Sequence, residues 1–115
     1  MIDFACKKFN LDEIIKCGLG LTKAELEIMK YFTSHYGEEF TSGELSKVLE
    51  MNITTLQRAT KKLYEKKIIL RHQKNLGSGG YIYTYEASSK KEIREILKEI
   101  IKSWSKKVED EIDKW

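Results

Sequence analysis

In the middle of the chain, the apolar positions change from helical spacing to alternation. Leu45, Val48 and Leu49 lie on one face at i, i+3 and i+4, which predicts a short helix. Thr41 is followed three residues later by Glu44, the pattern of a capping box, in which the two side chains satisfy each other's backbone N–H groups. The first helix of this region is therefore expected to begin directly after Thr41.

A second helix is predicted from Ile53, with Asn52 as its N-cap. Its apolar positions recur at helical spacing: Leu56, Ala59, Leu63 and either Thr60 or Tyr64. The opposite face has short polar side chains in its first half and mostly cations in its second: Thr54, Gln57, Arg58, Lys61, Lys62 and Glu65. A recognition helix has this composition, because its N-terminal residues contact base edges in the major groove while its flanks meet phosphates.

Two β-branched and aromatic runs follow, over residues 68–73 and 81–86, and both predict strands. Residues 74–80 between them are rich in glycine and tolerate the positive φ of a tight turn. The order of two helices and a hairpin is typical of a winged helix-turn-helix, with the hairpin as the wing.

The charge distribution follows the same division. Residues 53–80 have seven basic side chains and one acidic side chain, or +6, while residues 1–52 sum to −3 and residues 81–115 to zero, in agreement with the net charge of +3. A concentrated basic patch is the electrostatic signature of a phosphate-binding surface. The alternative is a solvated basic face that has no partner.

Three stretches resemble the small archaeal winged-helix regulators of the MarR/TrmB-like group. They are residues 19–25, which open a helix, the segment NITTLQRATKKLYEKKIILR, and the hairpin end GGYIYTYEA. The resemblance implies a mainly α fold with a small β-hairpin (α+β), in which residues 53–66 enter the major groove and residues 71–81 lie along the backbone or minor groove. It also implies a dimeric, sequence-specific double-stranded DNA-binding transcription regulator.

Candidate DNA contacts can be assigned on this basis. The residues expected at base edges are Thr54, Thr55, Gln57 and Arg58. The residues expected at phosphates are Lys61, Lys62, Arg71, Lys74 and Asn75. The N-terminus of the helix at Ser42 is expected to donate backbone N–H groups to a further phosphate.

The region before residue 40 is expected to support this unit. Residues 1–9 are interpreted as a turn or short helix that packs on a partner. Asn10 caps a helix that Gly18 is expected to stop, and Thr22 caps another that runs to about Tyr36. Phe40 is expected to form a short strand that pairs with the hairpin.

The last segment, residues 88–115, is predicted to be one long amphipathic helix, separate from a winged-helix domain over residues 1–87. At 1.5 Å per residue it would be about 40 Å long, more than a domain of this size covers. Its apolar stripe therefore predicts a homodimer interface formed by Leu97, Ile101, Trp104, Val108, Ile112 and Trp115. The alternative is a helix that folds back on its own domain.

Other classes of function have less support. A winged-helix protein-interaction module and a non-specific DNA-binding protein are the alternatives, although the basic, polar face of residues 53–66 favours DNA. No nucleophile–base arrangement or CxxC or HxxxH spacing stands out, so no enzyme activity, metal or cofactor is expected, and Cys6 and Cys17 are interpreted as reduced structural residues.

Tyr81, Tyr83 and Tyr85 share one strand face, which predicts core packing rather than base stacking. The chain has no apolar run long enough to span a membrane and no signal-peptide pattern at its start, so a cytoplasmic location is expected. Any small-molecule effector is expected in a crevice beside Trp104 and residues 19–24.

Overall fold

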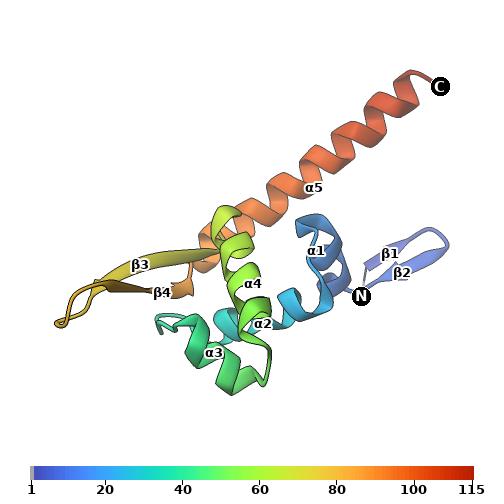
Figure 1. Cartoon of the computed structure of the whole chain (residues 1–115). Helices are drawn as coiled ribbons and strands as arrows, with labels where there is room; N and C mark the ends of the chain where they lie inside the picture. The colour runs from blue at the N-terminus through green and yellow to red at the C-terminus, as the bar shows by residue number, and fades with distance from the viewer. Residues whose placement is uncertain (1) are drawn as a thin grey trace.

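The computed structural model describes residues 2–115 as five helices and two separate two-stranded antiparallel sheets (Figure 1). In chain order the elements are β1 (Ile2–Phe4), β2 (Lys7–Phe9), α1 (Leu11–Leu19), α2 (Lys23–Ser34), α3 (Ser42–Leu49), α4 (Ile53–Glu65), β3 (Ile69–Asn75), β4 (Tyr81–Ala87) and α5 (Lys90–Asp113).

Helix starts follow the capping residues that the sequence indicates. The hydroxyls of Thr22 and Thr41 accept from the backbone N–H groups of Glu25 and Glu44, and both glutamates accept a backbone N–H in return, so α2 and α3 begin with complete capping boxes. The Asn52 side chain accepts from the N–H of Thr54 at 2.7 Å and caps α4. Because these signals are local, they fix where the helices begin before any tertiary contact forms.

One core joins α2, α3, α4, the hairpin and the start of α5. Its largest fully buried apolar side chains are Phe32, Leu19, Ile28, Leu45, Leu56, Leu63, Ile68 and Ile69, and Leu19 brings α1 into the same core. Thr60 is buried while Tyr64 is 37% exposed, so Thr60 occupies the fourth position of the apolar face of α4. The Thr60 hydroxyl remains satisfied because it donates to the carbonyl of Leu56 at 2.9 Å.

The β3–β4 hairpin runs antiparallel from the pair Ile69–Ala87 to the pair Asn75–Tyr81. Phe40 exchanges two backbone hydrogen bonds with Tyr85, both 2.8 Å long, so the expected short pairing with the hairpin is confirmed. Helices α3 and α4 meet through a turn at Glu50, whose φ of 53° lies in the left-handed region. The predicted fold class is confirmed: the chain is an α+β winged helix-turn-helix with β3–β4 as its wing.

Two expectations for the N-terminal region are wrong. Residues 2–9 form the β1–β2 hairpin rather than a turn or short helix. Helix α1 passes through Gly18 and ends at Gly20, which takes a left-handed conformation with φ 66°. Gly18 instead marks a close approach, because a Cβ on it would lie 3.1 Å from Cγ2 of Ile100 in α5.

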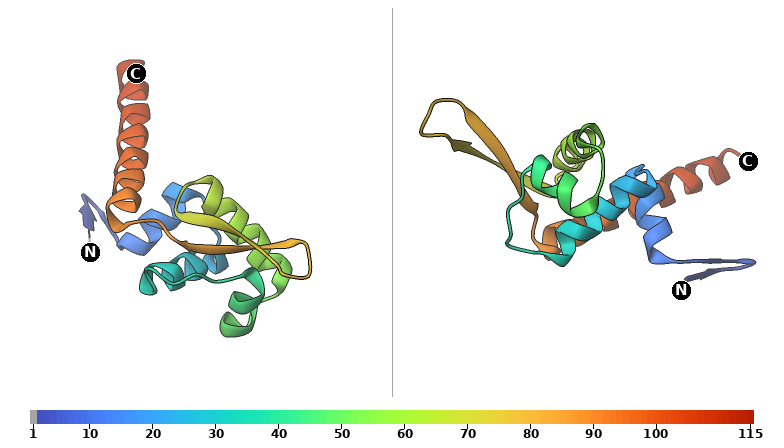
Figure 2. Two further views of the ribbon diagram at one scale, coloured as in Figure 1. Left: turned by 90° about the vertical axis from the view of Figure 1, so that its left-hand side faces the viewer. Right: turned by 60° about the horizontal axis from the view of Figure 1, so that its bottom comes forward.

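Helix α5 extends far beyond the core (Figures 1 and 2). Ile93 in its first turn is 5% exposed, whereas Trp104 is 61% exposed and Trp115 is fully exposed. The chain has a radius of gyration of 17.0 Å, whereas a compact domain of this length has about 13 Å. The second half of α5 therefore leaves an apolar stripe in water.

None of the helices formed by residues 2–115 combines the length and the apolar character needed to cross a membrane.

The contact at Gly18 leads to a stability prediction. Gly18→Val is expected to lower the free energy of unfolding by about 1–3 kcal/mol, because the added atoms overpack the α1–α5 contact. Gly43→Val is the matched control, since a Cβ there has its nearest neighbour at 3.8 Å and ordinary contact suffices. Denaturant unfolding of both variants measures the difference. Equal stabilities would contradict the close approach.

Candidate nucleic-acid interface

The exposed side of α4 is polar and basic. Leu56, Ala59 and Leu63 turn one side of the helix into the core, and the opposite side presents Thr54, Gln57, Arg58 and Lys61 to solvent, with Thr55 half-buried beside them. Arg58 and Lys61 have no ion-pair partner among the residues that the structure describes. Their charges are therefore uncompensated at short range on this side of α4.

Arg71 is held between two aromatic rings. The Cζ atom of its guanidinium lies 4.3 Å from the ring centroid of Tyr64 in α4 and 4.3 Å from that of Tyr83 in β4. A guanidinium over an aromatic ring is attracted to it by a cation–π interaction, and this attraction is stronger where the guanidinium is shielded from water. We call these three residues the arginine clamp; it joins the end of α4 to the wing, and Arg71 remains exposed within it.

The clamp is continuous with the exposed side of α4. Gln57, Lys61 and Tyr64 follow at i, i+4 and i+7, which places them in one row along the helix. On the wing, Arg71 shares its strand face with Gln73 and Asn75, because alternate residues of a strand point the same way. The α4–wing face is defined by these exposed residues: Thr54, Gln57, Arg58, Lys61, Tyr64, Arg71, Gln73 and Asn75.

Lys74 lies on the other side of the wing. Its position between Gln73 and Asn75 turns it to the opposite strand face. There its ammonium pairs with Glu39 at 3.4 Å, and Glu39 also accepts the hydroxyl of Thr84 at 2.6 Å. The hydrogen bond from Thr84, with help from Lys74, holds the pKa of Glu39 below its usual value. Lys74 and Arg71 are thus not neighbours on one surface.

Lys62 has a structural role that sequence reasoning missed. Its ammonium donates to the carbonyl of Gly20 and pairs with Glu25 at 3.0 Å, so it ties α4 to the start of α2. Burial raises the pKa of Glu25, but the backbone N–H of Thr22 and the Lys62 ammonium outweigh it, and the net pKa lies below the usual value. Because this contact occupies its ammonium, Lys62 is not counted as part of the α4–wing face, and its contact with phosphate stays a prediction.

Ser42 stands at the first position of α3. It is half-buried, and its hydroxyl lies 3.5 Å from that of Thr60 on α4. This contact links the two helices of the helix-turn-helix and places the N-terminus of α3 beside α4.

The three tyrosines of β4 differ in burial, although they share a strand face. Tyr85 is 9% exposed and belongs to the core, Tyr83 is half-buried in the clamp, and Tyr81 is 53% exposed. Core packing is therefore confirmed only for Tyr85. A hydrogen bond with Tyr83 raises the pKa of Tyr81.

Residues 2–115 nowhere bring together three or more His, Cys, Asp or Glu side chains in an arrangement able to hold a metal ion. Cys6 and Cys17 are both exposed and free. The sequence predicted a crevice beside Trp104 and residues 19–24, but the structure has its apolar groove elsewhere. An open apolar groove runs instead between α1 and the first half of α5, lined by Leu11, Ile14, Ile15, Gly18, Leu97 and Ile101 among others.

The Lys62–Glu25 contact predicts a pH-dependent loss of stability. Lys62→Met is expected to lower the free energy of unfolding by about 1 kcal/mol at pH 7, a small value because a third of the lysine side chain stays in water. A carboxylate whose pKa is lowered on folding stabilises the protein above its unfolded value of 4.5, and this contribution is lost as the pH falls through the folded value.

The difference between native and Lys62→Met protein is therefore expected to shrink below pH 4.5. Thermal unfolding between pH 3 and pH 7 measures it. Lys61→Met, which removes a neighbouring lysine that forms no ion pair within the described part of the chain, is the control and is expected to leave stability unchanged. A difference that stays constant with pH would rule out the Glu25 contact.

The chain resembles known proteins over nearly its whole length. A possible transcriptional regulator from Methanosarcina mazei Go1 has a structure with a TM-score of 0.94 and 45% identity, covering 100% of this chain and 96% of that one. A MepR mutant of S. aureus bound to an oligodeoxyribonucleotide has a TM-score of 0.56 at 13% identity, covering 90% and 72%, and shares the fold. An uncharacterized protein of Methanocaldococcus jannaschii is 25% identical over 86% of this chain and 74% of its own length. The model of the DnaD N-terminal domain matches residues 9–108, so this chain belongs to the DnaD N-terminal domain family.

Proposed function

We propose that this protein is a sequence-specific double-stranded DNA-binding transcriptional regulator that acts as a homodimer. The observation that carries the proposal is the α4–wing face, on which short polar groups of α4 and two cations without an ion-pair partner among residues 2–115 adjoin the arginine clamp. Two relatives support it: one is named a possible transcriptional regulator, and another winged helix of the same fold is bound to an oligodeoxyribonucleotide. We also propose that, among winged-helix regulators, this protein is of the MarR/TrmB-like type.

In the proposed complex α4 lies in the major groove. Thr54, Thr55, Gln57 and Arg58 occupy its first turns, where a recognition helix meets base edges. Gln57 has the donor and acceptor pair that adenine requires, and Arg58 has the fork that guanine O6 and N7 accept. The side chains toward the wing have a different role: Lys61, Arg71 and Asn75 contact phosphates, with Ser42 at the N-terminus of α3.

The arginine clamp gives the wing a fixed phosphate ligand. An arginine on a free side chain loses rotamer entropy when it binds, whereas the stacked guanidinium of Arg71 is already ordered. Lys74 is held less firmly, because its pair with Glu39 joins two exposed side chains. Such a surface pair is worth little, so a phosphate on the outer face of the wing can replace the carboxylate.

The homodimer follows from the second half of α5. Ile101, Trp104, Val108, Ile112 and Trp115 are between 39% and 104% exposed and lie on a single helical stripe. Since exposed stripes of this size mark interfaces, we assign the stripe, with Leu97, to contact between protomers. A two-fold pair presents two α4 helices to successive major grooves, which requires a pseudo-palindromic site.

A protein-interaction module and a non-specific DNA-binding protein are the competing functions. The exposed side of α4 has no large apolar centre, whereas a protein interface is depleted in charge at its core. Non-specific binding uses phosphates alone and leaves the polar residues of the first turn of α4 without a role.

Selection from a random-sequence duplex pool at two salt concentrations tests the proposal. We expect enrichment of a symmetric motif whose half-sites lie one helical turn apart, with affinity that falls steeply with salt. Salt-dependent binding without enrichment would favour the non-specific alternative. Absence of binding at low salt would favour the protein-interaction module.

Two substitutions separate base contacts from phosphate contacts. Arg58→Ala is expected to relax sequence preference at one position, at a cost of about 1–3 kcal/mol on the preferred site. Lys74→Ala is expected to weaken all sequences alike and to reduce the salt slope by about one. Lys106→Ala on the outer side of α5 is the control for the loss of one charge. The Arg58 assignment fails if preference and affinity both survive Arg58→Ala.

A further inference from the structure

The apolar stripe of α5 is symmetric about the point between Trp104 and Ser105. Ile101 and Val108 lie three and a half positions to either side of that point, and Leu97 and Ile112 lie seven and a half positions to either side. In an antiparallel pair of identical helices that cross at this point, Ile101 of one copy faces Val108 of the other, and Leu97 faces Ile112. In a parallel pair each residue faces the same residue of the other copy, so this symmetry would have no effect on the packing.

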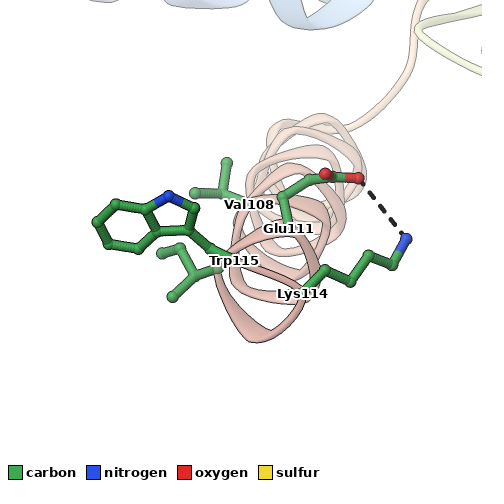
Figure 3. Close-up of a pocket in the computed structure, with 5 residues that line it drawn as sticks. Val108, Glu111, Lys114 and Trp115 are labelled. Atoms are coloured by element: carbon green, nitrogen blue, oxygen red, sulfur yellow. Dashed lines mark ion pairs between the residues drawn. The ribbon is translucent and has the colours of Figure 1, made fainter.

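Burial along α5 matches the antiparallel arrangement. The symmetry pairs two residues that line the groove between α1 and α5, Leu97 and Ile101, with two residues of the free half of the helix, Val108 and Ile112. Figure 3 shows Val108 and Trp115 projecting from the same side of the free half, with the Glu111–Lys114 ion pair on the adjoining side. Each copy therefore has both an apolar groove and an apolar rod that fits the groove of the other.

Charge favours the same pairing. Residues 94–98, which this register places beside residues 111–115 of the second copy, have two basic side chains and one acidic one, while residues 111–115 have two acidic side chains and one basic one. Antiparallel packing brings the basic start of each α5 beside the acidic end of the other, and parallel packing would align like charges. At the symmetric register Lys98, on the edge of the groove, lies on the same flank of the helix pair as Glu109 of the second copy, about 3 Å from it along the helix axis.

The amount of exposed apolar surface is adequate for a stable interface. The five exposed side chains of the stripe include two tryptophans, and aromatic side chains bury about 150–250 Å² each. With Leu11 at 59% exposure in the groove, each copy offers roughly 700 Å² of apolar surface, close to the roughly 800 Å² per partner of a standard interface.

From these observations we propose that the end of α5, residues 108–115, seats in the groove between α1 and α5 of a second copy, with the two-fold axis between Trp104 and Ser105. The inference rests on the homodimer of the proposed function and specifies its register and its docking site. It also gives α1 a role: with the first half of its own α5, it forms the groove that holds the end of the partner helix.

Charge reversal tests the register. Lys98→Glu and Glu109→Lys are each expected to raise the dimer dissociation constant by about tenfold, because each replaces two symmetric attractions with two repulsions. The double variant restores both contacts with reversed sign and is expected to return to within about threefold of the native value. Lys106→Glu on the outer side of α5 is the matched control and should leave dimerisation unchanged. Analytical ultracentrifugation measures the constant, and circular dichroism checks that α5 remains helical.

Disulfide cross-linking gives a second, independent measurement. In a background with Cys6→Ser and Cys17→Ser, the double variant Ile101→Cys with Val108→Cys is expected to form a covalent dimer on oxidation. Val108→Cys alone is expected to remain uncrosslinked, because the two copies of this residue lie about 10 Å apart along an antiparallel pair. In a parallel pair the single variant would cross-link instead.

The outcomes separate this inference from the proposed function. A dimer that binds DNA but shows no rescue by the double charge reversal, or that cross-links through Val108→Cys alone, overturns the register and leaves the proposed function standing. A native protein that stays monomeric overturns both the register and the homodimer, while selection on DNA still decides the DNA-binding part. Rescue together with the expected cross-linking pattern supports the inference.

Discussion

Burial of one side of α4 is the interaction on which the rest of the structure depends. Leu56, Ala59 and Leu63 are completely buried, and they contact a core to which every other element except the β1–β2 hairpin contributes or is anchored. Because a helix has only one orientation that buries these residues, the direction of the exposed side is fixed at the same time. The proposed DNA-binding surface is in this sense the complement of the core, and no separate feature is needed to orient Arg58 and Lys61.

Two contacts hold the C-terminal end of α4. Lys62 attaches it to the loop before α2, and the stacking of Arg71 on Tyr64 attaches its last turn to the wing. Both use a cation from the basic segment, so part of the positive charge in residues 53–80 has a structural role. Composition alone counts such charges as available to a ligand, and only the structure separates them from those that remain free.

The sequence predicted most of the fold because its signals are local. Capping boxes, helical spacing and the glycine-rich turn each involve residues within a few positions of one another, and the start of α2, α3 and α4 and the wing followed from them. One prediction was wrong where a tertiary contact is involved. Gly18 lies inside α1, where it allows the close approach of Ile100 in α5, and no residue near Gly18 in the sequence indicates that contact.

The candidate site shows the same limit. Lys61 and Lys62 are adjacent and chemically identical, yet a rotation of about 100° between successive residues directs one to solvent and the other to Glu25. Strand alternation could have separated Arg71 from Lys74, since it needs only the sequence. The partner ring from Tyr64 could not be found in that way, because it depends on how α4 packs against the wing.

The length of α5 connects the proposed dimer to the proposed DNA contact. Ile93 is the buried residue that anchors α5 to the core, and the axis proposed above lies between Trp104 and Ser105, about 17 Å further along the helix. In an antiparallel pair the two anchoring residues are then about 35 Å apart, which is the spacing of successive major grooves on one face of B-DNA. A helix that ended at its last core contact would bring the two winged domains too close for this spacing. The exposed half of α5, which is costly for a monomer, therefore has the length that two recognition helices one turn apart require.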